Sequence, residues 1–263
     1  MPKKSSVNVG DSKINYQGVL MTIKEWYDRN HMIVEFEDGC VREIFSNGNA
    51  RWRKGNIRSF NVVATYGKGY LGGDKYNSRE HEFVYKTWNH MLERCYTEKY
   101  HQRFPTYIGC SVCEEWLNFQ NFAEWYYNNV WNDNFEESKL DKDILVKGNK
   151  IYSPQTCILV DNYINCLFTK CDKIRGEYPI GVSEDNRTHQ IRAQVIRKNG
   201  MKTTKYVPKT DNKDNDILMA FNWYKESKEQ YIKEVADTYK AKYPNFPQKL
   251  YDALYAYEVE ITD

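Results

Sequence analysis

The residues best suited to recognising another molecule lie between His189 and Val195. Polar and apolar side chains alternate in this stretch, so Gln190, Arg192 and Gln194 share one face of a predicted strand and the apolar residues share the other. Glutamine can pair with adenine, and arginine with guanine, in the major groove of DNA. The pattern therefore predicts a DNA-reading strand, and a solvated sheet face is the alternative interpretation.

The chain around this strand is basic. Between Lys173 and Lys209 there are nine basic and three acidic residues, a local charge of +6, whereas the whole chain carries only +2. Five of these basic side chains are expected to neutralise DNA phosphates. They are Arg187, Arg197, Lys198, Lys202 and Lys205. The near-neutral total argues against a polycation that binds nucleic acid along its whole length. It does not exclude DNA binding, because the positive charge is concentrated in one segment.

A second basic group follows a predicted turn at residues 47–49. It contains Arg51, Arg53 and Lys54, with Arg58 a few residues further on. These side chains are candidates for a second DNA contact. A protein-binding surface is an equally open interpretation of the same segment.

Cysteine spacing suggests a third kind of chemistry. Cys110 and Cys113 have the separation of a zinc-binding pair, which Cys166 and Cys171 could complete. The second pair has an unusual spacing, and buried thiols are common in protein cores, so zinc is not expected. The seven cysteines are expected to be reduced, as in a cytoplasm.

Composition indicates a folded chain that does not cross a membrane. Aromatic residues make up 15% of the 263 residues, enough rings to build the cores of several small modules. The mean hydropathy is -0.81, and no apolar run approaches the ~18 residues of a membrane span. The N-terminal stretch lacks the apolar core of a secretion signal.

Periodicity predicts a modular α+β fold. Short strands and tight turns over residues 1–60 indicate a small SH3-like β-barrel. The glycines of residues 61–82 predict a linker. Helical stripes are expected at 83–95 and 114–130, with their aromatic residues in the core. Strand, loop, strand and a short helix follow at 139–168. A three-stranded sheet and a helix at 214–243 complete a domain over 172–243, before a tail at 244–263.

Several motifs together resemble those of bacteriophage homing endonucleases. These proteins combine an HNH-type (His-Me finger) nuclease domain with a DNA-binding domain of the APETALA-two/ERF type. The likeness is carried by Trp88-x-x-Met91-Leu92-x-Arg94-Cys95-Tyr96, Val112-Cys113-x-x-Trp116-x-x-Phe119-x-x-Phe122, Leu140-Asp141-Lys142-Asp143-Ile144-Leu145, Lys150-Ile151-Tyr152-Ser153-Pro154 and Tyr178-Pro179-Ile180-Gly181-Val182. It implies an HNH-like ββα domain over 83–171 and an APETALA-two domain over 172–243.

The resemblance also implies a set of site residues. Asp141, Lys142 and Asp143 fall where the family has its metal-binding Asp and catalytic His, and no His lies between His101 and His189. Asn162 and Asn165 match the last metal ligand, and Asn149 the residue that orients the base. An active site of this kind takes Mg²⁺ or Mn²⁺. His90 is a candidate substitute base, and a solvated strand edge is the alternative interpretation of residues 141–143.

The function expected from these features is binding of double-stranded DNA by a phage-encoded protein in the cytoplasm of an infected bacterium. Its HNH-like domain is then either a divergent, metal-dependent endonuclease or a degenerate one. Two other interpretations stay open. The first is a nuclease scaffold that inhibits a host defence protein by binding it, and the second is a transcriptional regulator.

Overall fold

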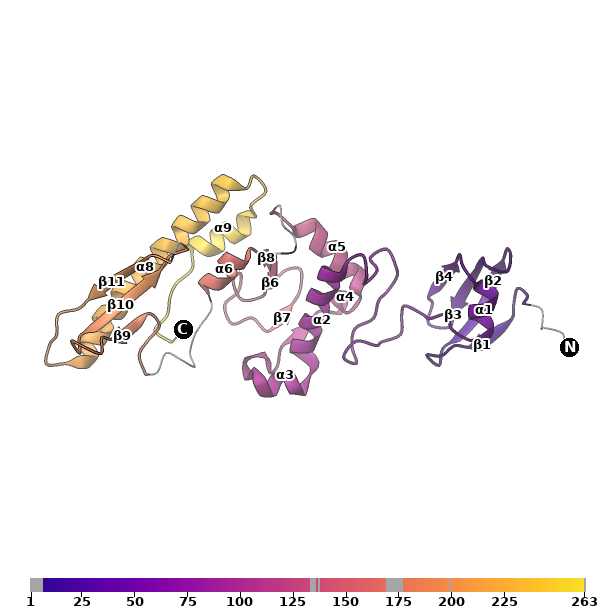
Figure 1. Ribbon diagram of the computed structural model, residues 1–263, viewed down its shortest axis with the longest axis horizontal. Helices are drawn as coiled ribbons and strands as arrows, with labels where there is room; N and C mark the ends of the chain where they lie inside the picture. The colour runs from indigo at the N-terminus through magenta and orange to yellow at the C-terminus, as the bar shows by residue number, and fades with distance from the viewer. Residues whose placement is uncertain (1–6, 133–135, 137, 169–176, 199, 263) are drawn as a thin grey trace. The chain divides into compact units, whose positions relative to one another are not determined.

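The computed structural model describes residues 7–132, 136, 138–168, 177–198 and 200–262 (Figure 1). The chain forms two compact units. The first comprises Met1–Asn128 with Lys150–Ser153, and the second comprises Asn129–Asn149 with Pro154–Asp263. The expected mixture of helices with small, mostly antiparallel sheets is confirmed. The boundary between the units runs through the predicted domain 83–171.

The first unit begins with a four-stranded antiparallel sheet. Its strands are β1 (Ser12–Ile14), β2 (Leu20–Trp26), β3 (Met32–Phe36) and β4 (Val41–Ile44), and they pair in chain order. Among the described residues no pairing joins β1 to β4, so the sheet is open where the sequence predicts a barrel. Its core includes Met21, Val34 and Ile57, each fully buried.

A helix replaces the turn predicted at residues 47–49. Helix α1 (Gly48–Arg53) begins after Asn47, whose left-handed backbone has a φ of 51°. A Cβ on Gly48 would lie 2.8 Å from the carbonyl oxygen of Asn30, so only glycine allows the chain to approach so closely. The basic group that the sequence places after this turn is therefore presented by a helix and the residues after it.

The predicted helix 83–95 is confirmed as α2 (Glu82–Tyr96). It is followed by α3 (Glu98–Arg103), the 3₁₀ turn η1 (Pro105–Tyr107) and β5 (Ser111–Val112). The helix predicted at 114–130 is divided at Asn118 into α4 (Glu114–Leu117) and α5 (Phe119–Asn129). The aromatic stripe is core as expected, since Trp88, Trp116 and Phe122 are fully buried and Trp88 donates a 2.7 Å hydrogen bond to the Trp116 carbonyl.

The glycine-rich segment predicted as a linker packs against this helical core. The Gln120 side chain on α5 donates to the carbonyls of Leu71 and Gly73 at 2.9 and 3.2 Å. A Cβ on Gly72 would lie 1.9 Å from the Asn118 side-chain oxygen. The glycines thus permit close packing, which a composition-based linker assignment does not anticipate.

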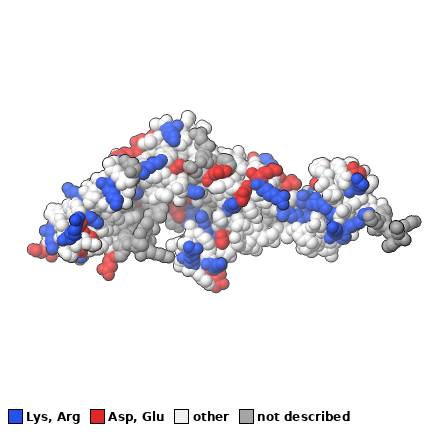
Figure 2. Space-filling model, in the orientation of Figure 1, with Lys and Arg blue, Asp and Glu red and all other residues white. Residues whose placement is uncertain are grey.

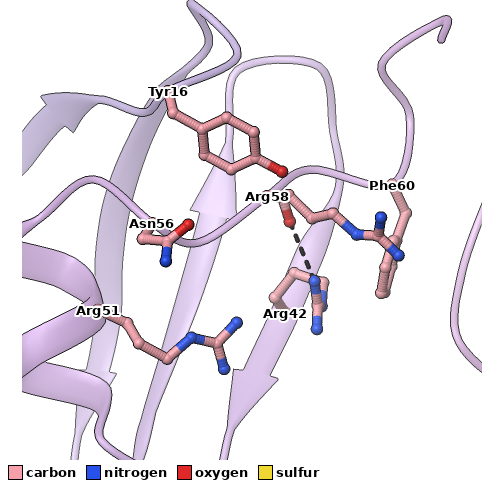
Figure 3. A pocket seen from close by; sticks show the side chains of 6 residues that line it. All are labelled: Tyr16, Arg42, Arg51, Asn56, Arg58 and Phe60. Carbon is pink, nitrogen blue, oxygen red and sulfur yellow. Dashed lines mark hydrogen bonds between the residues drawn. The ribbon is translucent and has the colours of Figure 1, made fainter.

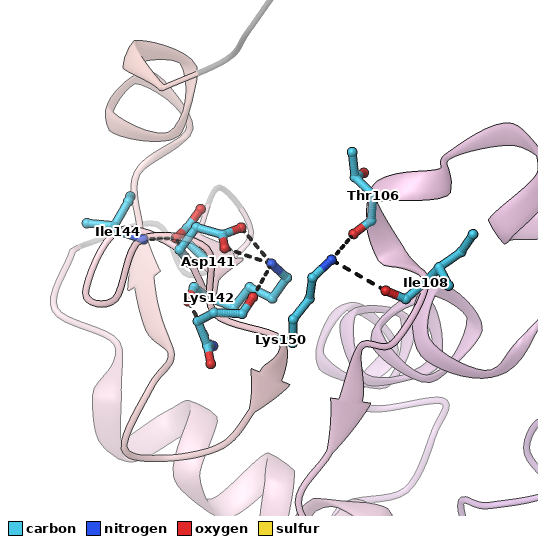
Figure 4. A network of polar contacts seen from close by, with 8 residues as sticks. Thr106, Ile108, Asp141, Lys142, Ile144 and Lys150 are labelled. Carbon is cyan, nitrogen blue, oxygen red and sulfur yellow. Dashed lines mark hydrogen bonds and ion pairs between the residues drawn. The ribbon is translucent and has the colours of Figure 1, made fainter. Parts of the chain in front are cut away.

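The segment Lys150–Ser153 belongs to the first unit. Strand β7 (Ile151–Tyr152) pairs in parallel with β5, and the Lys150 ammonium donates to the carbonyl oxygen of Thr106 at 2.6 Å (Figure 4). Burial raises the pKa of Tyr152, which lies beside Arg94. Two motifs that are far apart in the sequence therefore meet here.

The second unit contains a short antiparallel strand pair and a larger sheet. Strands β6 (Lys139–Asp141) and β8 (Ile158–Val160) pair, and α6 (Asn162–Leu167) follows β8 directly. The expected three-stranded sheet is present, with order β11-β10-β9 and bounds Val182–Glu184 for β9, Ile191–Ile196 for β10 and Lys202–Tyr206 for β11. Helix α8 (Lys213–Lys242) packs against it.

The predicted C-terminal tail forms part of this core. Helix α9 (Gln248–Tyr255) packs on α8 and buries Leu250 and Leu254 completely. The Val259 backbone attaches the segment after α9 to α8. Its N–H donates to Glu229 at 2.8 Å and its carbonyl accepts from Lys225 at 2.9 Å. No helix among the described residues is long and apolar enough to cross a membrane.

Candidate functional site

The central strand β10 has one buried face and one open face. Ile191, Ala193 and Val195 are at most 3% exposed and belong to the core cluster that includes α8 residues. Arg192 and Gln194 lie on the opposite face, as the alternation predicts. Gln190 precedes β10, at the end of a tight loop in which the Asp185 N–H donates to its carbonyl.

The strand register adds residues to the open face that periodicity alone did not identify. Antiparallel partners share a face of a sheet. Arg192 lies opposite Ser183 on β9 and Tyr206 on β11, and Gln194 lies opposite Thr204. The Asn199-Gly200 pair, a sequence signal for a hairpin turn, could have located Thr204 and Tyr206.

Arg192 is held in place by its neighbours. Its Nη1 lies 3.1 Å from Asp185 Oδ2, and its Nε donates to Ser183 Oγ at 3.1 Å. The Tyr206 hydroxyl donates to the same Asp185 oxygen at 3.3 Å. The backbone N–H groups of Thr188 and Arg187 hold the pKa of Asp185 below its ordinary value. The Arg192 side chain, about one-third exposed, thus lies beside a buried carboxylate.

Two of the predicted phosphate contacts are engaged inside the unit. Arg197 forms an ion pair of 2.6 Å with Glu234 on α8 and lies 4.6 Å from the centroid of the Tyr231 ring. The Lys198 ammonium lies over the Tyr163 ring at 4.7 Å from its centroid. These contacts fix Arg197 and Lys198 on residues of the helices, so neither belongs to the open face with Arg192.

The register separates the remaining basic residues. Lys205 lies opposite Ala193 and so shares the α8 side of the sheet, whereas Lys202 lies opposite Ile196 on the open face. Arg187 is exposed in the loop before β10. Figure 2 shows acidic and basic side chains interspersed over this end of the chain. The described part of the +6 segment is therefore a mixed surface rather than a uniformly positive one.

Strands β6 and β8 with helix α6 have the order expected for a ββα element. Asp161 begins α6 by accepting the Tyr163 N–H at 2.6 Å, and it also accepts the Tyr239 hydroxyl at 2.9 Å. Asn162 and Asn165 lie on this helix. Asn162 shares a pocket with Lys139 and Lys198, and Asp141 is not among its lining residues.

Asp141 has the contacts of a turn-forming residue. Its Oδ1 accepts the N–H groups of Asp143 at 2.8 Å and Ile144 at 2.7 Å (Figure 4). Burial raises its pKa, although these two N–H groups oppose the rise. Among the described residues no group of three or more His, Cys, Asp and Glu side chains could hold a metal ion. These contacts fit Asp141 to a structural role.

The Lys142 ammonium has three hydrogen-bond acceptors around it. Its Nζ lies 2.8 and 2.7 Å from the two carboxylate oxygens of Asp143 and 2.7 Å from the carbonyl oxygen of Asn149 (Figure 4). The Asn149 side chain donates back to the Lys142 carbonyl at 3.0 Å. The structure thus joins the two residues that the resemblance places as base and orienting group. The three acceptors give the Lys142 side chain contacts typical of a structural residue.

The other candidate groups are divided between the two units. His90 is an exposed residue of α2 in the first unit. Cys110 and Cys113 also belong to the first unit, where Cys110 is buried and burial raises the pKa of Cys113. Cys166 belongs to the second unit, and Cys171 lies outside the described residues.

Comparison with known proteins adds no relative. No family model, no curated protein and no solved structure matches the chain.

Proposed function

We propose that this protein binds double-stranded DNA through the open face of β9, β10 and β11. The observation that carries the proposal is the placement of Arg192 and Gln194 side by side on a face whose reverse is packed against α8. Residues i and i+2 of a strand, such as Arg192 and Gln194, are about 6.6 Å apart along the strand. Two base-pair steps of DNA cover about the same length, roughly 6.8 Å. The two side chains can therefore address base pairs that are two steps apart in the major groove.

The surrounding residues have consistent roles in this proposal. Arg192 is already oriented by Asp185, so less side-chain freedom is lost when it binds a guanine edge. Lys202 on the same face and Arg187 in the adjoining loop are available to phosphates. Helix α8 supports the sheet from behind. Arg197, Lys198 and Lys205 are not part of the proposed contact surface.

We further propose that the element formed by β6, β8 and α6 is a degenerate HNH-like module in a phage-encoded, homing-endonuclease-like protein. Its support is the chain order of the strands and helix together with the Lys142–Asn149 contact. In the resemblance Lys142 stands at the position of the base, and its ammonium contacts Asp143 and Asn149. The protein is therefore expected to bind DNA without cutting it.

Fluorescence anisotropy with labelled duplexes at several salt concentrations tests the binding proposal. Arg192→Ala is expected to weaken binding by about 1–3 kcal/mol and to relax sequence preference. Lys249→Ala is the matched control, because it removes one exposed positive charge from α9 in the same unit. Equal affinity of the wild type and Arg192→Ala at every salt concentration would show that the sheet face is not the interface.

Incubation of the protein with supercoiled plasmid and Mg²⁺ or Mn²⁺ tests the degenerate module. No nicks are expected. Nicking that disappears in Asp141→Ala and in chelator would instead establish an active metal-dependent nuclease.

A further inference from the structure

An arginine-lined pocket lies at one end of the N-terminal sheet. It has a volume of about 320 Å³. Its lining residues come from the loop after β1, from β4, from α1 and from the segment after α1. They are Tyr16, Arg42, Arg51, Asn56, Arg58 and Phe60 (Figure 3). In this view the Arg51 side chain extends from α1 toward Arg42.

Arg42 forms the buried part of the pocket. Its side chain is 12% exposed, its Nη1 donates to the Arg58 carbonyl at 3.0 Å, and its guanidinium lies 3.7 Å from the centroid of the Phe60 ring. Its Nε is buried and has no hydrogen-bond partner among the described residues. A buried guanidinium with an unused donor favours a bound acceptor, because an unsatisfied charged group is costly to bury.

The charge around Arg42 is poorly balanced. Its nearest carboxylate oxygen, on Asp74, is 3.9 Å away, and that side chain is 68% exposed. Within the described ranges no ion pair joins Arg51 or Arg58 to a carboxylate. Burial lowers the pKa of Arg42, Asp74 opposes this change, and the charges of Arg51 and Arg58 add to it. Three guanidinium groups thus line one pocket, and within the described residues their one ion pair is the 3.9 Å contact with Asp74.

We propose that this pocket binds the terminal phosphate group of a nucleotide. A dianionic monoester matches several guanidinium groups better than a phosphodiester does, and its free oxygens can reach a recessed arginine. A phosphodiester carries one charge and is flanked by sugars on both sides. Tyr16 is 62% exposed and offers a ring against which a base can stack. The site belongs to the first unit and does not depend on DNA binding by β10.

The source of the phosphate is either a free nucleotide or the 5′ end of a strand. Calorimetric titration with inorganic phosphate, a nucleoside 5′-monophosphate and the unphosphorylated nucleoside tests the shared chemistry. Single-stranded oligonucleotides with a 5′ phosphate or a 5′ hydroxyl then distinguish the sources. Phosphate and the monophosphate are expected to bind and the nucleoside is not. Preference for the 5′-phosphorylated strand identifies strand ends, and binding of the mononucleotide alone identifies the free nucleotide.

Variants locate the binding. Arg51→Gln and Arg58→Gln are each expected to weaken monophosphate binding about tenfold, the loss of one charged hydrogen bond. Arg29→Gln removes an exposed charge elsewhere on the same sheet domain and is expected to change the affinity by less than about twofold. Circular dichroism verifies that each variant is folded.

Three results would overturn the proposal. The first is absence of monophosphate binding at millimolar concentration, and the second is equal binding of the nucleoside. The third is Arg51-dependent binding of both strands with equal affinity, which would make an internal diester the ligand.

Discussion

Asp185 holds Arg192 across the loop that joins β9 to β10. The carboxylate is buried, and its Oδ2 lies 3.1 Å from the arginine Nη1. Its Oδ1 accepts the N–H groups of Arg187 and Thr188 at 3.0 and 3.1 Å. One residue therefore shapes the loop and orients the side chain proposed to read DNA.

Asp185→Asn separates these two roles. The asparagine oxygen can still accept the loop N–H groups, but the negative charge beside Arg192 is lost. We expect overall affinity for random duplex to rise slightly with the added net positive charge, while discrimination between sequences falls. Selection from a random duplex pool, compared with the wild type, measures both changes. A variant that selects the same sequences as sharply as the wild type would show that Asp185 does not position Arg192 for recognition.

Lys142→Met tests the structural role assigned to the ammonium. The change leaves Asp143 and the Asn149 carbonyl without their shared partner, and we expect a loss of about 2 kcal/mol in the free energy of unfolding. Lys147→Met removes a neighbouring, more exposed lysine that pairs with Glu260 at 3.2 Å, and it is expected to cost less than about 1 kcal/mol. Urea denaturation measures both. Equal stability of the two variants would contradict the structural assignment.

Glu184 makes the free energy of unfolding of the second unit depend on pH. Hydrogen bonds from Lys213, Tyr178 and His189 lower its pKa to about 2. An unfolded glutamate has a pKa of about 4.3. Because the folded value is the lower one, the stabilisation is complete above that pH and is lost as the pH falls toward 2.

The matching variant is Glu184→Gln. Its urea midpoint is expected to lie below that of the wild type at neutral pH, and the gap is expected to narrow as the solution is acidified through this window. A gap that is independent of pH would mean that the Glu184 carboxylate is not the group responsible.

Gly181 occupies a position that no other residue fits. Its φ is +74°, and a Cβ would lie 2.1 Å from atoms of the Tyr224 ring. Gly181→Ala therefore combines left-handed backbone strain with a clash against a buried side chain. We expect a loss of about 3 kcal/mol in stability. Gly200→Ala is a useful comparison, because that glycine also has a positive φ but nothing lies within 4 Å of the added Cβ. A similar loss in both variants would show that strain alone acts at Gly181.

The sequence alone determined the features that follow the two-residue period of a strand or the 3.6-residue period of a helix. The alternation around Arg192 predicted which face of β10 is open, and the spacing of Trp88, Met91 and Leu92 predicted the buried side of α2. Both follow from the geometry of an extended strand or a helix, which assigns each position to a face without knowledge of the rest of the chain. The long helix α8 was predictable for the same reason, and its end was predictable because Pro244 cannot continue a helix.

Only the tertiary structure decided which charged groups meet. Arg197 pairs with Glu234, and Arg42 gathers with Arg51 and Arg58 from separate elements. Such contacts join residues that periodicity treats independently, so composition predicted a basic surface where ion pairs make a mixed one. Local pattern assigns a side chain to a face of its element, whereas the packing of distant elements determines its partners and therefore its chemistry.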